Sequence, residues 1–138
     1  MHTLIPKISD VKFKAVLVGV IVDNAGTLLL MTTLAAALVS TGLSEDEVMR
    51  RMRSTSGLLL GLIIGLSFTV LGGYFAGRIA GRAEVLHGLL VAVMGMVIAL
   101  IFRESDIPAW FHMVASAGML PAGIAGGYLA QKRRPGLK

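Results

Sequence analysis

Residues 57–80 read GLLLGLIIGLSFTVLGGYFAGRIA, an apolar run with no acidic or basic side chain before Arg78. A helix needs about 20 such residues to cross a hydrocarbon core of about 30 Å, because each residue adds about 1.5 Å. Backbone groups in lipid must be satisfied within the protein, and barrel strands would alternate in pieces of about 10 residues. This continuous run therefore predicts a transmembrane helix.

Three more runs of the same kind flank the first, at about residues 13–39, 85–102 and 108–130. Of the 138 residues, 55% are hydrophobic and only 15% are charged. An average soluble domain has about 25% charged residues, and disorder requires low hydrophobicity and high charge. The sequence therefore predicts a single all-α membrane domain over residues 1–138, built as a bundle of four transmembrane helices.

The basic residues predict how the bundle is oriented, because lysine and arginine are retained on the cytoplasmic side. One set flanks the chain ends and the second loop: Lys7, Lys12, Lys14, Arg78, Arg82, Lys132, Arg133, Arg134 and Lys138. The smaller set is Arg50, Arg51, Arg53 and Arg103. We expect a multi-pass protein of a bacterial cytoplasmic (inner) membrane with both termini in the cytoplasm.

The loop at residues 40–56 is the one sizeable piece outside the predicted spans. Ser44 followed by Glu47 matches a capping box, in which each residue satisfies a backbone N–H of the other. This predicts a short helix with a partly apolar side. The helix would either lie on the outer surface of the bundle or of the bilayer, or dock an external partner.

Two features concern how the spans pack. Gly72-Gly73-Tyr74 and Gly126-Gly127-Tyr128 resemble each other, which predicts two repeated helical hairpins. Glycines four residues apart share a helix face and let two backbones approach closely. The predicted packing residues are Gly61, Gly65, Gly73, Gly77, Gly81, Gly123 and Gly127. Their spacing leaves open whether they pack within one chain or between subunits.

Asp23 is the acid inside the first span, where an ionisable group is costly and often marks function. With Asn24, Thr27 and His87 it forms a candidate site for an ion or a proton. Two interpretations remain open for Asp23: a protonatable or cation-binding group, or a hydrogen-bonded acid that joins helices. His87 would serve helix adhesion or, alternatively, a proton relay with Asp23.

Five basic residues are candidates for contact with anionic lipid headgroups. They are Arg78, Arg82, Lys132, Arg133 and Arg134. Their long side chains can extend from a helix end to the membrane surface. A specific phosphate site is the alternative interpretation.

The stretch GGYFAGRIAGR at residues 72–82, followed by Glu84 and His87, resembles a glycine-rich pattern in uncharacterised small bacterial membrane proteins with four spans. The resemblance covers about a fifth of the chain and implies a fold without an activity. Small multidrug exporters and dimeric fluoride channels share the size and span number. This chain departs from both, because Asp23 has no tryptophan nearby and the fluoride-channel signature is not found in its expected setting.

The sequence contains no cysteine and no recognisable nucleophile, phosphate-binding loop or metal motif. We therefore expect no enzyme activity, no cofactor, no metal and no binding of nucleic acid. The expected partners are the lipid bilayer and either further copies of this chain in a homo-oligomer or a larger membrane complex. The first hypothesis is an accessory or structural subunit that docks through its glycine faces. The alternative is a small oligomeric transporter or channel for an ion or small molecule that uses Asp23.

Overall fold

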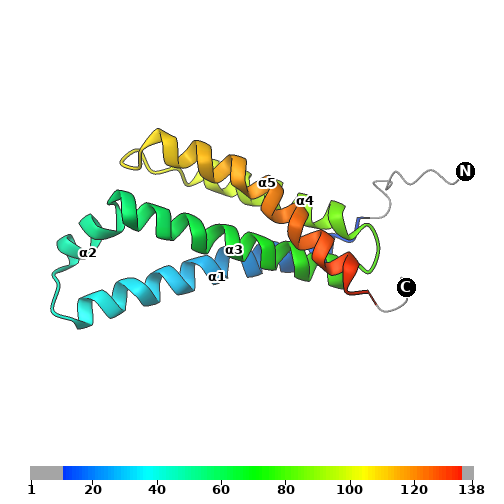
Figure 1. Ribbon diagram of the computed structural model, residues 1–138, viewed down its shortest axis with the longest axis horizontal. Helices are drawn as coiled ribbons and strands as arrows, with labels where there is room; N and C mark the ends of the chain where they lie inside the picture. Colours follow the sequence, from blue (N-terminus) through cyan, green and yellow to red (C-terminus); the bar gives the residue numbers. More distant parts are fainter. Residues whose placement is uncertain (1–10, 135–138) are drawn as a thin grey trace, which may run out of the picture.

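The computed structural model describes residues 11–134, and this part of the chain is helical apart from its turns (Figure 1). The helices are α1 (Phe13–Ser40), α2 (Glu45–Met52), α3 (Thr55–Ala80), α4 (Glu84–Ile101) and α5 (Ala109–Lys132). All except α2 are long and apolar enough to cross a membrane. The predicted all-α fold with four candidate spans is confirmed, and the span bounds differ by one or two residues. Lys7 and Lys138, two of the basic residues used to predict the orientation, lie outside the described residues.

Helix α2 begins as its sequence predicts. The Ser44 hydroxyl accepts a hydrogen bond from the Glu47 backbone N–H, and the Glu47 carboxylate accepts one from the Ser44 backbone N–H at 2.9 Å. Both partners of the capping box are thus present. Val48 is the buried residue of this helix, which therefore lies with one apolar side against the bundle.

The chain reverses sharply between α3 and α4. Gly81 ends α3 in the left-handed conformation, with φ of 67°, and donates its N–H to the Gly77 carbonyl. Glycine suits this position because it has no Cβ to clash with the backbone. Ala83 also has a positive φ, of 48°. The sequence predicted that Gly81 is a packing residue. In the structure it ends α3, and a Cβ at this position would meet nothing within 4 Å in the described chain.

Helix α3 is the centre of the bundle and packs against α1, α4 and α5, whereas α1 does not contact α5. The helices lie close together near the turn at residues 81–83 and spread apart toward α2 (Figure 1). We call the two ends of the molecule the 81–83 end and the α2 end.

Glycines explain why the bundle is tight near the 81–83 end. A Cβ added at Gly19 would lie 2.6 Å from the Gly72 carbonyl oxygen, and one at Gly73 would lie 2.7 Å from the Gly123 carbonyl oxygen. The backbone of α3 therefore meets that of α1 on one side and that of α5 on another, an approach that only glycine permits. Toward the α2 end larger side chains separate the helices, as where the Phe68 ring packs over Gly26.

Large apolar side chains cover the outside of the described helices. Phe13 is 85% exposed, Leu29 71% and Ile101 69%. Such a surface is unfavourable in water but is the expected partner of lipid tails. The exposed apolar shell and the four long helices together indicate a multi-pass membrane protein.

Candidate functional site

A cavity of about 410 Å³ lies between the spreading helices, in the half of the bundle nearer α2. Asp23, Asn24 and Thr27 line it from α1, and Thr69 lines it from α3. The remaining wall is mostly apolar and includes Met31, Leu66, Ile98, Phe102, Phe111 and Met119. The structure thus brings three of the four predicted ion-site residues to one cavity.

Asp23 sits in this wall with 4% of its surface exposed. Its Oδ1 accepts a hydrogen bond from the Thr69 hydroxyl at 3.1 Å, while Oδ2 has no hydrogen-bond partner among the described residues. A buried polar atom left without a partner costs about 1–3 kcal/mol, so it calls for an explanation.

Gly95 of α4 keeps the space beside this oxygen open. A Cβ at Gly95 would lie 3.2 Å from Asp23 Oδ2 and 2.6 Å from the terminal carbon of Met119. Any larger residue at this position would press on the carboxyl group. The unpartnered oxygen therefore faces a place that the sequence leaves without a side chain.

Thr69 can serve Asp23 in either charge state. Its hydroxyl oxygen lies 3.1 Å from Asp23 Oδ1 and also 3.1 Å from the Gly65 carbonyl oxygen. When Asp23 is ionised, the hydroxyl can donate to the carboxylate. When Asp23 is protonated, the hydroxyl can donate to the Gly65 carbonyl and accept a hydrogen bond from the carboxyl O–H. The pair can thus bind or release a proton without moving its heavy atoms.

The side chains of Asn24 and Thr27 each form a hydrogen bond with a backbone carbonyl of their own helix, α1. The Asn24 amide donates to the Val20 carbonyl at 3.0 Å, and the Thr27 hydroxyl donates to the Asp23 carbonyl at 2.8 Å. These bonds fix the two side chains at the cavity wall. Neither side chain forms a hydrogen bond with Asp23 Oδ2.

His87 does not join the Asp23 site. It is fully buried near the 81–83 end, where its Nε2 accepts the Lys12 backbone N–H at 2.9 Å. Its Nδ1 lies 2.9 Å from the Ala83 carbonyl oxygen, so Nδ1 carries the proton and the ring is neutral. Along α4, His87 is about 12 Å from Gly95, at about 1.5 Å per residue. The expected grouping of His87 with Asp23 is therefore not found, because the ring caps the start of α1.

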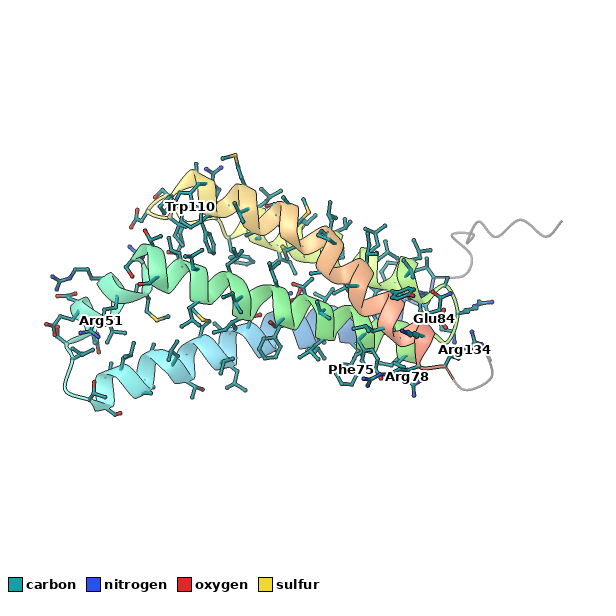
Figure 2. All side chains as sticks on the ribbon, in the orientation of Figure 1. Arg51, Phe75, Arg78, Glu84, Trp110 and Arg134 are labelled. Atoms are coloured by element: carbon teal, nitrogen blue, oxygen red, sulfur yellow. The ribbon has the colours of Figure 1, made fainter. Side chains whose placement is uncertain are left out.

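Two of the predicted headgroup cations, Arg78 and Arg134, lie at the 81–83 end, opposite Arg51 and Trp110 (Figure 2). Arg134 forms an ion pair with the buried Glu84 at 3.3 Å, and Arg78 donates to the Arg133 carbonyl at 3.2 Å. The Arg133 guanidinium also lies over the Tyr74 ring, 5.9 Å from its centroid. These arginines tie the end of α5 to α3 and α4, a role that the sequence analysis did not predict.

The predicted packing glycines divide into two groups. Gly73, Gly77, Gly123 and Gly127 meet backbone or small side chains of neighbouring helices within the chain. A Cβ at Gly61 would make only ordinary contact with Met31 at 3.4 Å, and one at Gly65 or Gly81 would meet nothing within 4 Å. Gly65 and Gly81 therefore make no close helix contact within the described chain.

Sequence reasoning missed Thr69, the partner of Asp23. One signal was available, because Thr69 lies four residues after Gly65 and four before Gly73, on one face of α3. It also missed Gly95, which lies on the apolar α4 without any motif. The pairing of Arg53 with Glu104 and Asp106 across the α2 end was not predicted either.

Comparisons with known proteins give no assignment for this site: no family model matches the chain, and neither the curated proteins nor the solved structures contain a significant match. Among residues 11–134, no three His, Cys, Asp or Glu side chains come together as metal ligands would. Function must therefore be argued from the geometry of the cavity.

Proposed function

We propose that the protein is a small multi-pass membrane protein that binds a cation or a cationic solute at Asp23 and moves it across the bilayer. One observation carries the proposal: a buried carboxyl oxygen that has no hydrogen-bond partner within residues 11–134 faces a cavity between the helices. An acid within a span is expensive to bury, so it usually lines a substrate or ion pathway.

The Asp23–Thr69 pair supports an exchange between a cation and a proton. The ionised carboxylate attracts the cation, with Oδ1 held by Thr69. Protonation of the carboxyl group removes that attraction and releases the cation, while Thr69 keeps a hydrogen bond to the acid. Both occupancies thus leave the buried oxygen Oδ1 satisfied.

The role of accessory subunit is the weaker candidate. It relied on glycine faces that dock onto other chains, but the contacts of Gly73, Gly123 and Gly127 are made within this chain. A partner would therefore have to use the apolar outer surface, which lipid also covers. Assembly into a homo-oligomer stays part of the transporter proposal.

The setting of the proposed function is the bacterial cytoplasmic membrane, with the 81–83 end toward the cytoplasm. The support is the uneven distribution of basic residues, of which Arg78, Arg133 and Arg134 lie together at that end. The hairpin α1–α3 and the hairpin α4–α5 would form the two repeated units.

Cation flux into proteoliposomes tests the proposal. The protein is reconstituted with a trapped pH dye and a protonophore, and inward gradients of sodium, potassium or guanidinium, an organic cation with N–H donors, are applied separately. Cation entry is then matched by proton exit, so the lumen becomes alkaline. We expect at least one cation to give this response, and Asp23→Asn to slow it at least tenfold.

The matched control is Asp46→Asn, which removes an exposed acid of α2 outside the spans and should leave the flux unchanged. Flux no greater than that of empty liposomes for all three cations would contradict the proposal. Equal flux through the wild type and Asp23→Asn would do the same, because it would remove Asp23 from the pathway.

A further inference from the structure

We infer that the ligand of the cavity is an amphipathic organic ammonium ion, with a head that donates a hydrogen bond to Asp23 Oδ2 and an apolar body that extends toward the α2 end. This inference rests on the proposed function, whose site it specifies further.

The head must be a hydrogen-bond donor. An ionised carboxylate only accepts hydrogen bonds, and Asp23 Oδ2 has no donor among the described residues. No lysine, arginine or histidine of the described chain lines the cavity, so the protein supplies no countercharge there. A protonated amine provides both the N–H donor and the positive charge that this oxygen lacks.

A bare metal ion fits the same place poorly. Calcium takes 6–8 oxygen ligands, and magnesium requires a near-ideal octahedron of oxygens. Beyond Asp23, the polar side chains of the cavity are Asn24, Thr27 and Thr69, and two of them are bonded to backbone carbonyls of α1. The rest of the wall is apolar and has no side-chain oxygen that could replace the water ligands of a metal ion.

The body of the ligand must be apolar and extended. From Gly95, beside the carboxyl group, α4 runs along the cavity past Ile98, and Phe102 follows its last residue, Ile101. The seven steps from Gly95 to Phe102 cover about 10 Å, at about 1.5 Å per residue. Phe111 of α5 adds a second aromatic ring to the wall. The volume of about 410 Å³ lies within the range of small-molecule sites, about 300–1,000 Å³.

Three probes with one body separate charge from apolar filling: 4-phenylbutylammonium, 4-phenylbutan-1-ol and 4-phenylbutyrate. The full-length protein in detergent micelles carries ¹³C-labelled methionine methyl groups, and Met31 and Met119 report from the cavity wall. We expect saturable shifts of both signals with the ammonium ion, at least tenfold weaker binding of the alcohol, and no binding of the carboxylate.

Two variants test the head of the ligand. Asp23→Asn should lower the affinity for the ammonium ion at least tenfold and change that for the alcohol less than twofold. Gly95→Ala keeps the acid but places a methyl group 3.2 Å from Oδ2, so it should also weaken ammonium binding. Its displaced neighbour is the flexible end of Met119, so this variant remains informative if Asp23→Asn does not fold.

Equal binding of the three probes would overturn the inference and show a cavity that takes apolar groups only, such as a lipid chain. A preference for ammonium that survives in Asp23→Asn would overturn it as well. Sodium or potassium flux without ammonium binding would leave the proposed function intact while this inference fails. Ammonium binding that depends on Asp23, without flux of any cation, would support the inferred ligand and contradict the proposed transport.

Discussion

At the scale of single residues, Asp23 and Glu47 show how the surroundings decide what an acid does. Asp23 is buried between helices with one oxygen bonded to Thr69 and the other facing a cavity. Glu47 is exposed on α2, and its interactions with Ser44 and Arg51 are local. The first acid is available for a ligand, whereas the second is committed to a helix end.

The capping box predicts a pH dependence for α2. The Ser44 backbone N–H, together with the Ser44 hydroxyl and Arg51, lowers the pKa of Glu47 below its ordinary value of 4.5. A lowered pKa in the folded state means that the ionised form stabilises the helix above pH 4.5. This stabilisation is lost as the pH falls through the lower, folded pKa.

We therefore expect the Cα chemical shifts of residues 45–52 to have helical values at neutral pH and to move toward random-coil values below the ordinary glutamate pKa. Glu47→Gln should abolish this change, whereas Glu45→Gln should leave it in place. Shifts that stay constant throughout the acid range in the wild type would contradict the assigned role of Glu47.

At the scale of helices, the position of the glycines sets where the bundle is tight and where it opens. Gly72, Gly73, Gly88 and Gly123 bring backbones together near the 81–83 end. The cavity lies farther along, where bulky side chains hold the helices apart and Gly65 and Gly95 contribute no bulk. Close packing at one end thus fixes the helices whose spread forms the site.

A pair of glycine substitutions tests this account. A Cβ at Gly123 would lie 2.7 Å from the Ala92 Cβ and still closer to the Gly88 carbonyl oxygen, so Gly123→Val must separate α4 from α5. Overpacking of this kind costs about 1–3 kcal/mol. Gly65→Ala meets nothing within 4 Å and should be neutral or slightly stabilising, because alanine favours a helix over glycine by about 0.5–1 kcal/mol.

The measurement is reversible unfolding of each variant in mixed detergent micelles, followed by circular dichroism. We expect a lower midpoint for Gly123→Val and an unchanged or higher one for Gly65→Ala. Equal destabilisation by both substitutions would show that glycine acts through the helix backbone and not through the contacts between helices.

At the scale of the whole molecule, the two ends carry different charge patterns. The 81–83 end holds Arg78, Arg133 and Arg134, whose partners fasten the end of α5. At the α2 end, Arg53 bridges to Glu104 and Asp106 in the α4–α5 connection. These exposed pairs are each worth less than about 1 kcal/mol, but they join the two hairpins beside the cavity.

The proposed orientation is testable because the natural sequence has no cysteine. Ser105→Cys lies in the loop at the α2 end, and Gln131→Cys lies near the end of α5; both positions are exposed. We expect a membrane-impermeant maleimide to label Ser105→Cys in intact cells and Gln131→Cys only after permeabilisation. The reverse pattern would invert the orientation, and labelling of both in intact cells would contradict it.

The sequence by itself was sufficient for the four spans and for the start of α2. Span length depends on a continuous apolar run, and the capping box on two residues three positions apart, so both are local properties. The sequence also singled out Asp23, since an acid within an apolar run is unusual wherever its partners lie.

Only the tertiary structure decided what Asp23 and His87 contact. The spans are apolar on nearly every side, so their periodicity does not reveal which face points inward. The rotation and crossing of each helix are set by glycine contacts between segments far apart in sequence, such as Gly19 with Gly72. Those contacts place Thr69 and the cavity at Asp23 and bring the Lys12 backbone N–H to His87.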